Sequence, residues 1–246
     1  MTMKAIVTGT SRGLGAAIAS ALLDRGIPVL GLARQHNPAL ARTGAECTQV
    51  ALDLSTPEAL SHWLAGGDMA RFLADADQVL LINNAGTVQP VGPLGTQGSA
   101  AVAQAVSLNI AAPLMLADAF VTASPAATDR RILHVSSGAA RNAYAGWNVY
   151  CATKAALDHH ARAVLEDAVP GLRICSLAPG VIDTDMQVQV RTSDEARFPA
   201  RERFEALKRD GALVPPAVCA ARLVGYLLSE EFGDHAVADL REVAST

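Results

Sequence analysis

One glycine-rich turn near the N-terminus constrains the fold of this chain more than any other segment. An apolar run over 4–8 ends at Gly9, and Gly13 and Gly15 follow before an Ala- and Leu-rich segment over 16–25. We expect a strand, a tight turn and a helix, whose N-terminus presents free N–H groups and a positive dipole end to a phosphate. This order predicts a nucleotide-binding unit, although an ordinary strand–helix turn also uses glycine.

The rest of the chain repeats the same alternation of short apolar runs and helical segments. We expect strands at 4–8, 28–33, 46–52, 78–83, 131–136, 172–177 and 236–240. Helices are expected at 16–25, 57–64, 100–123, 149–168 and 215–228, with a kink or break at Pro113. Continuously apolar strands are typical of a parallel sheet that is covered on both faces. The predicted fold is α/β: a single-domain, doubly wound, Rossmann-like parallel sheet over 1–246, with about seven strands and helices on both faces.

Composition argues against several other classes of protein. The 246 residues are 50% hydrophobic, which is ample for a core. Four scattered cysteines with no CxxC pair argue against a disulfide scaffold and a metal site. A net charge of −4 with interspersed signs disfavours nucleic acid as a partner. No apolar run reaches the roughly 18 residues of a membrane span, and the N-terminus has no secretory pattern. We therefore expect a cytoplasmic protein with no metal, membrane or nucleic-acid partner.

The end of the second predicted strand indicates which dinucleotide would bind. An acid at this position binds the ribose hydroxyls of NAD, but here the strand ends Leu32-Ala33-Arg34. An arginine can bind a 2′-phosphate that a carboxylate would repel. Arg12 in the glycine-rich turn could close on the same phosphate. The two arginines favour NADP(H), unless both are simply solvated surface residues.

A tyrosine and a lysine have the spacing of an acid–base pair. Tyr150 and Lys154 lie four residues apart in a predicted helix, which places both side chains on one face. A neighbouring ammonium lowers a phenol pKa and suits a general acid that protonates an alkoxide. The alternative is a half-buried aromatic beside a surface lysine. Ser137 directly follows the fifth predicted strand, at the edge where open α/β sheets bind ligands.

The motifs TGTSRGLG (8–15), NNAG (83–86), YCATK (150–154) and PGVIDT (179–184), with Asn109 and Ser137, resemble the short-chain dehydrogenase/reductase family over about residues 3–240. The resemblance implies that Tyr150 is the catalytic acid, Lys154 lowers its pKa and binds ribose, Ser137 holds the substrate carbonyl, and Asn109 supports a water chain to the lysine. The implied cofactor-binding residues are Gly9, Ser11, Arg12, Gly13, Leu14, Gly15, Arg34, Asp53, Leu54, Asn84, Ala85, Gly86, Tyr150, Lys154, Pro179, Gly180, Ile182 and Thr184.

Within that family, the segments 146–154, 177–187 and 208–214 resemble sepiapterin reductases and bacterial benzil-reducing enzymes. The resemblance implies an NADPH-dependent carbonyl reductase acting on a ketone or vicinal diketone. The expected substrate contacts are Ser137, Trp147, Tyr150, Met186 and Asp239. Trp147 and Met186 could equally be packing residues, and Asp239 a surface carboxylate in place of a pterin anchor. The charged segment 187–211 is either a substrate lid or a solvated helix pair.

Two other functions fit the same motifs. One is a 3-oxoacyl or alcohol dehydrogenase of the same family, and the other is a regulator that senses NADP without turnover. The complete set of Ser137, Tyr150 and Lys154 argues against the regulator. The family also implies a homodimer, or a tetramer, built on paired helices. An Ala-rich face at Ala152, Ala155, Ala156 and Ala163 would allow such packing, or packing on the sheet.

Overall fold

The computed structural model describes residues 2–42 and 45–243, and within them seven parallel strands form one sheet in the order β3-β2-β1-β4-β5-β6-β7. Residues 1, 43–44 and 244–246 of the expected single domain lie outside the described part. The strands are β1 (Met3–Thr8), β2 (Val29–Ala33), β3 (Cys47–Ala51), β4 (Gln78–Asn83), β5 (Asp129–Val135), β6 (Leu172–Ala178) and β7 (Val237–Asp239). The strand order reverses direction between β1 and β4, which opens a ligand-binding crevice at the carboxyl ends of those strands.

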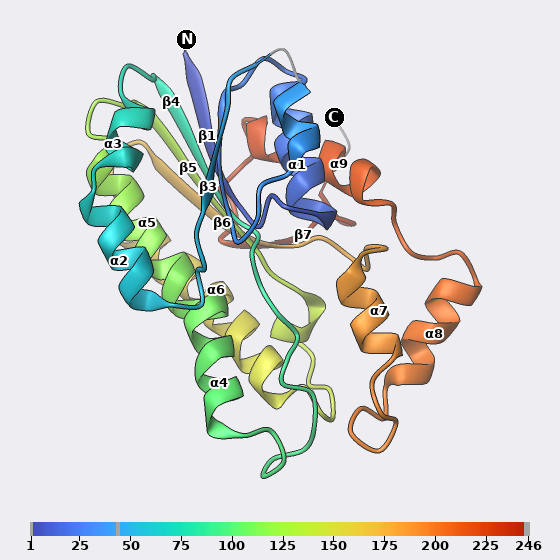
Figure 1. The fold of residues 1–246 in the computed structure, drawn as a ribbon. Helices are drawn as coiled ribbons and strands as arrows, with labels where there is room; N and C mark the ends of the chain where they lie inside the picture. Colours follow the sequence, from blue (N-terminus) through green and yellow to red (C-terminus); the bar gives the residue numbers. More distant parts are fainter. Residues whose placement is uncertain (1, 43–44, 244–246) are drawn as a thin grey trace.

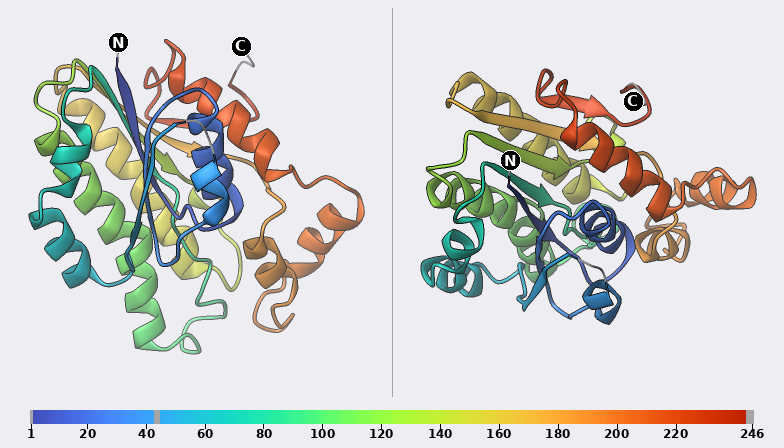
Figure 2. Two further views of the ribbon diagram at one scale, coloured as in Figure 1. Left: turned by 45° about the horizontal axis from the view of Figure 1, so that its top comes forward. Right: turned by 90° about the horizontal axis from the view of Figure 1, so that it is seen from above.

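Two layers of helices cover the sheet, as predicted (Figure 1, Figure 2). One face carries α1 (Gly13–Leu23) and α9 (Pro216–Leu228). The other carries α2 (Pro57–Ala65), α3 (Asp68–Leu73), α5 (Ala112–Ala123) and α6 (Asn148–Glu166). The chain also forms α4 (Ser99–Val106), α7 (Asp185–Arg191), α8 (Arg201–Arg209) and the short 3₁₀ turns η1 (Pro38–Arg42) and η3 (Gly138–Ala140).

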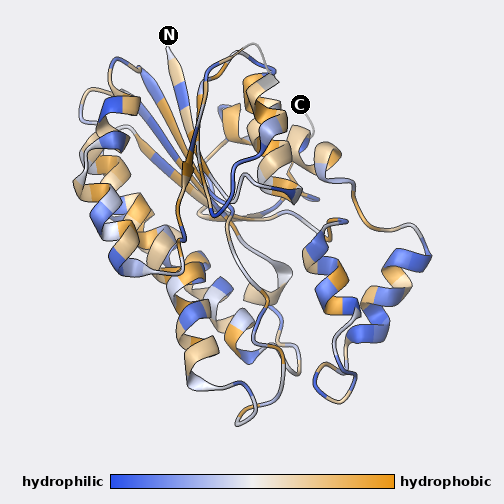
Figure 3. Ribbon diagram, in the orientation of Figure 1, coloured by the Kyte–Doolittle hydropathy of each residue, from blue (hydrophilic) through white to orange (hydrophobic). Residues whose placement is uncertain are grey.

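The strands are apolar because both of their faces are buried. Every residue of β2 and β4 is buried, and Figure 3 shows the mostly hydrophobic strands between the helix layers. Neighbouring residues of β1 enter opposite cores, with Ala5 and Val7 on the α1/α9 side and Ile6 on the other. The sheet therefore fixes the carboxyl ends of the strands as a rigid edge, on which the functional residues are placed.

Of the kink or break expected at Pro113, a break does not occur. The helix runs without interruption over Ser99–Ala123, and a π-helical turn at Ser107–Ala111 (η2) lies just before the proline. Pro113 has no N–H to donate to the carbonyl of Asn109, and the wider turn shifts the hydrogen-bonding register instead of ending the helix. This 25-residue helix is long and apolar enough to cross a membrane by length and composition. Leu116 and Phe120, however, pack in the core beneath the sheet.

The segment predicted as a lid or helix pair forms two helices, α7 and α8, that contact each other. They project from the body of the molecule beside the carboxyl edge of the sheet (Figure 1). Most of the surface of α8 is hydrophilic, but Phe204 on it is buried. The helix pair therefore has one apolar side turned toward the rest of the protein.

Candidate active site

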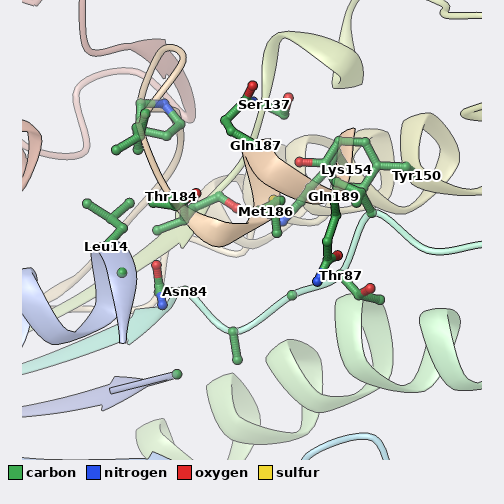
Figure 4. A pocket seen from close by; sticks show the side chains of 18 of the residues that line it. Leu14, Asn84, Thr87, Ser137, Tyr150, Lys154, Thr184, Met186, Gln187 and Gln189 are labelled. Atoms are coloured by element: carbon green, nitrogen blue, oxygen red, sulfur yellow. Dashed lines mark hydrogen bonds between the residues drawn. The ribbon is translucent and has the colours of Figure 1, made fainter. Parts of the chain in front are cut away.

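A cleft of about 800 Å³ runs along the carboxyl ends of the strands. All of the predicted cofactor and substrate residues line it, and of the predicted catalytic residues Asn109 alone lies behind its wall. Figure 4 shows Leu14, Asn84 and Thr184 toward one end, and Tyr150 and Lys154 toward the other. Arg34 and Asp53 line the cleft beyond β2 and β3. The cleft thus joins the glycine-rich turn to the tyrosine and lysine.

The glycine-rich turn is compact because Asn84 closes it from the next strand. The Asn84 side chain donates to the Thr8 carbonyl at 2.9 Å, and the Thr8 hydroxyl accepts from the backbone N–H of Asn84. A Cβ atom at Gly9 would lie 2.8 Å from the Asn84 amide nitrogen, and Gly9 has a φ of +77°. A Cβ at Gly15 would collide with the Gly9 carbonyl. These glycines are therefore required by contacts within the protein itself, next to the free N-terminus of α1.

The two predicted phosphate-binding arginines have different surroundings. Arg34 lies near Asp53, whose pKa is held below its ordinary value mainly by the hydroxyl of Ser55, with a smaller contribution from Arg34. Arg12 instead forms an ion pair with Asp185 at the start of α7, at 3.0 Å. Both side chains of that pair are largely exposed. This pair was not predicted from the sequence, because it joins residues more than 170 positions apart.

Asn109 lies behind the wall of the cleft and connects two of the elements that form it. It is buried in the π-helical turn, and its side-chain oxygen accepts from the Thr87 N–H at 2.9 Å. Its amide donates to the Thr87 carbonyl at 2.9 Å and to the Thr153 hydroxyl at 3.1 Å. The side chain therefore ties the loop after β4 to α6, immediately beside Lys154.

Ser137, Tyr150 and Lys154 meet at one end of the cleft. Ser137 follows β5, and its hydroxyl oxygen caps η3 by accepting from the Ala139 N–H at 3.1 Å. Tyr150 and Lys154 are both buried on the same face of α6, with the lysine Nζ 5.8 Å from the centroid of the tyrosine ring. The Lys154 ammonium donates to the Val135 carbonyl at 2.8 Å. A proton donor, a hydroxyl and an ammonium therefore share one small volume.

The electrostatics of this end differ from the sequence-based expectation that Lys154 lowers the pKa of Tyr150. Burial raises the pKa of Tyr150 to about 12, and a hydrogen bond with Ser137 offsets part of that rise. Burial lowers the pKa of Lys154 to about 8, with Asp158 acting in the opposite direction. Desolvation outweighs the neighbouring charge because both groups are almost fully buried. The phenol thus holds its proton at neutral pH.

An aromatic wall, defined here as Tyr144, Trp147 and Phe204, flanks the tyrosine. Trp147 is buried, stands edge-on to Tyr150 with ring centroids 5.2 Å apart, and stacks on Phe198 at 4.5 Å. Phe198 and Phe204 come from the α7–α8 segment, so the helix pair packs its apolar side on the tryptophan. Met186 on α7 also faces the cleft (Figure 4). Tyr144 and Phe198 were not predicted from the sequence.

Asp239 lies at the end of β7 and lines the cleft, but its carboxylate is already engaged. Arg241 donates to both oxygens, from Nε at 2.9 Å and from Nη2 at 2.6 Å. These hydrogen bonds hold the pKa of Asp239 below its ordinary value. The spacing of Asp239 and Arg241, two residues apart at the end of a strand, was the sequence signal that could have predicted this pair.

Comparison with known proteins gives one consistent result. Residues 3–195 match the family model for short chain dehydrogenases. Benzil reductase, (S)-benzoin forming, from Bacillus cereus is 34% identical over 92% of this chain and 94% of its own. Sepiapterin reductase from Meriones unguiculatus is 33% identical over 95% of this chain and 94% of its own. A crystal structure of a short-chain dehydrogenase/reductase from Burkholderia vietnamiensis is 50% identical, covers 98% of both chains and has a TM-score of 0.71.

Proposed function

Because the chain belongs to the short-chain dehydrogenase/reductase family, whose members use NAD(H) or NADP(H), we propose that it is an NADPH-dependent carbonyl reductase. One observation carries the proposal. Ser137, Tyr150 and Lys154 converge at the end of a cleft that also contains the glycine-rich turn. Its substrate in this proposal is an aromatic ketone or vicinal diketone.

The residues around the glycine-rich turn fit a phosphorylated dinucleotide. The turn leaves the N-terminus of α1 facing the cleft, where backbone N–H groups and the helix dipole favour a pyrophosphate. The strand β2 ends in Ala33 and is followed by Arg34, so no carboxylate stands where a 2′-phosphate would lie. Arg12 also lines the cleft. It would add a second guanidinium if it left its ion pair with Asp185 and bound the phosphate. These charges support NADP(H) over NAD(H).

Reduction needs a proton donor at the carbonyl oxygen, and Tyr150 has the properties of one. Its pKa of about 12 keeps the phenol protonated until negative charge develops on the substrate oxygen. The Ser137 oxygen accepts from Ala139, and the Ser137 O–H, which hydrogen-bonds with Tyr150, would turn to donate to the same substrate oxygen. The Lys154 ammonium stabilises the phenolate that remains. A bound reduced nicotinamide supplies the hydride in this reaction.

The aromatic wall supports a flat, aromatic substrate. Tyr144, Trp147 and Phe204 would stack against an aryl ring. Aromatic substrates would therefore bind more tightly than substrates with flexible acyl chains. Asp239 is occupied by Arg241, so it offers no free carboxylate to the amino group of a pterin. We therefore favour an aryl diketone of the benzil type over sepiapterin and over 3-oxoacyl thioesters.

A substrate panel tests the proposal. The wild-type enzyme is mixed with benzil, sepiapterin or an acetoacetyl thioester in the presence of NADPH or NADH, and with a simple secondary alcohol in the presence of NADP⁺ or NAD⁺. Cofactor absorbance at 340 nm is followed in each case. We expect the highest kcat/KM with benzil and NADPH. Turnover of the thioester with none of the diketone would contradict the substrate assignment, and a preference for NADH would contradict the cofactor assignment.

We also propose that the enzyme acts in the cytoplasm as a homodimer. Its four cysteines are free, as in a reducing compartment. Ala152 and Ala163 are exposed on α6, and Val106 on α4 and Leu165 on α6 are exposed apolar residues. These helices contact each other, and their uncovered apolar residues support pairing with a second copy. Sedimentation would test this, since a monomer at micromolar concentration contradicts it.

A further inference from the structure

One buried carboxylate next to the proposed active site has no part in the mechanism above. Asp158 is only 2% exposed and lies on α6, one helical turn beyond Lys154. Tyr150, Lys154 and Asp158 follow one another at intervals of four residues, so one face of α6 presents all three. All three are buried at the carboxyl edge of the sheet. A carboxylate in that position needs an explanation, because burying a charge costs free energy unless it is paired.

Three side chains hold the Asp158 carboxylate. Its Oδ1 accepts hydrogen bonds from the hydroxyls of Ser136 and Ser176, each at 2.7 Å. Its Oδ2 accepts from Nε of Arg141 at 3.3 Å. Ser136 and Ser176 are themselves buried, whereas Arg141 is about one-third exposed. Charge-assisted hydrogen bonds of this kind offset much of the desolvation cost and fix the carboxylate in one orientation.

The donors are placed where they control the position of Ser137. Ser136 directly precedes Ser137, and Arg141 directly follows the η3 turn that Ser137 caps. Asp158 therefore holds the segment 136–141 at both of its ends against α6. Ser176 on β6 adds the neighbouring strand to the same anchor. The distance between the Ser137 hydroxyl and the Tyr150 phenol depends on this anchor, because one lies on the segment and the other on α6.

The negative charge of Asp158 also acts on Lys154. Burial lowers the pKa of Lys154 to about 8, and the negative charge of Asp158 opposes that shift. The titratable or charged groups around this pair include Tyr150 and His160 on α6, His134 on β5, Cys175 on β6 and Arg141, and Arg141 also interacts with Asp239 on β7. Among them Arg141 is the cation that most directly compensates Asp158. Removing Asp158 or Arg141 should therefore affect Lys154 in opposite directions.

We propose that Asp158 is a positioning residue for the reduction, which holds the Ser137 segment against α6 and places a carboxylate one helical turn from Lys154. The inference rests on the proposed function, because it concerns the same Ser137, Tyr150 and Lys154. It adds Asp158 to the residues on which catalysis depends, although Asp158 touches neither substrate nor cofactor.

The test compares Asp158→Asn, Arg141→Met and Ser176→Ala in the full-length enzyme by kcat, KM and the pH profile of kcat with NADPH and the best diketone. We expect Asp158→Asn to lower kcat about tenfold, with the KM for NADPH within twofold of wild type. Its alkaline limb should move to lower pH by about one unit, because Lys154 loses its proton more readily. Arg141→Met should move that limb to higher pH. Ser176→Ala removes one hydrogen bond without a charge, so it should lower kcat slightly and leave the limb in place.

Three results would overturn the inference. If the wild-type enzyme reduces carbonyls, and Asp158→Asn has the same kcat and the same alkaline limb of its pH profile, this inference is overturned and the proposed function stands. A wild-type enzyme that reduces no carbonyl would overturn the proposed function and this inference with it. If Asp158→Asn does not fold, as judged by its thermal unfolding, Arg141→Met decides: an alkaline limb that stays in place or moves to lower pH would overturn the inference.

Discussion

Lys154 shows at the scale of a single residue how a reactive group is maintained at a cost to stability. Its side chain is 5% exposed, and its ammonium has the Val135 carbonyl as its hydrogen-bond acceptor. Burial lowers the pKa of Lys154 from 10.5 to about 8, so the charged form is disfavoured in the folded protein. Below pH 8 the folded state carries the full penalty of the buried charge. That penalty shrinks between pH 8 and 10.5, where the folded state releases the proton before the unfolded state does.

Lys154→Met should therefore stabilise the protein while it abolishes catalysis. The pKa shift of Lys154 corresponds to about 3 kcal/mol of destabilisation that the substitution would remove. The Val135 carbonyl would lose its donor, which would cost about 1 kcal/mol of stability. We expect a net gain of about 1–2 kcal/mol in the free energy of unfolding at pH 7, measured by urea denaturation. The gain should shrink as the pH is raised toward 10. Destabilisation at pH 7 would show that the buried ammonium contributes favourable contacts that outweigh its desolvation.

At the scale of elements, the α7–α8 pair contacts both ends of the cleft. An ion pair joins it to the glycine-rich turn, and aromatic packing joins it to the end that contains Tyr150. Arg12 in the glycine-rich turn pairs with Asp185 on α7, and Phe198 stacks on Trp147. The ion pair is largely exposed, so it contributes about 0–1 kcal/mol. A bound 2′-phosphate would compete with Asp185 for Arg12. Cofactor binding and the position of α7 are therefore coupled in this account.

Asp185→Asn should strengthen NADPH binding, because it frees Arg12 without creating a new contact. The expected effect is a two- to fivefold fall in the KM for NADPH, consistent with the small free energy of an exposed pair, and little change in the KM for NADH. Asp183→Asn is the matched control, since Asp183 lies in the same segment but pairs with Lys208. If both variants changed the KM for NADPH equally, Arg12 would not be the group that matters.

The sequence predicted the elements well where local pattern decides them and less well where distant contacts do. The strand 78–83 was predicted at its observed bounds, because its apolar centre, residues 79–82, is typical of a buried strand and too short for a helix. Of the kink or break expected at Pro113, the helix shows no break, because a π-helical turn accommodates the missing N–H. The helix α3 was missed because Asp68–Leu73 is short, with an apolar pattern too brief to detect. The Arg12–Asp185 pair depends on tertiary structure and has no local signal.

At the scale of the whole molecule, a buried polar chain crosses the core between the sheet and α6. The Asn83 amide lies 3.2 Å from Nδ1 of His134, and Nε2 of His134 lies 3.1 Å from Nδ1 of His160. Burial lowers the pKa of His134 to about 3, so its imidazole stays neutral in the folded protein. The unfolded chain binds that proton near pH 6.5. Stability should therefore fall as the pH drops below about 6.5, and continue to fall toward pH 3.

His134→Leu tests this acid sensitivity. In the wild type we expect His134 to contribute a loss of about 1.4 kcal/mol per pH unit between pH 6 and 4. The variant should show a shallower slope when the free energy of unfolding is measured by urea titration across that range. His62→Leu, which removes an exposed imidazole on α2, is the control. Equal slopes in the wild type and His134→Leu would mean that His134 is protonated in the folded protein.

The candidate site was largely predictable from sequence, because its residues follow strand ends that the fold places on one edge. What the sequence did not predict is electrostatic. The high pKa of Tyr150 and the engagement of Asp239 by Arg241 arise from burial and side-chain geometry in the folded protein. Asp158 was missed because an acid four residues after Lys154 reads as a surface pair on a helix, and only the folded structure shows it buried.

The role of Tyr150 is the central claim, and Tyr150→Phe tests it most directly. The measurement is the single-turnover rate of NADPH oxidation with the best carbonyl substrate, alongside NADPH binding followed by fluorescence. Loss of the proton donor should slow reduction by about 10²–10⁴-fold, while the dissociation constant for NADPH stays within a fewfold of wild type. A Tyr150→Phe enzyme that binds NADPH normally and reduces the substrate at the wild-type rate would contradict the account.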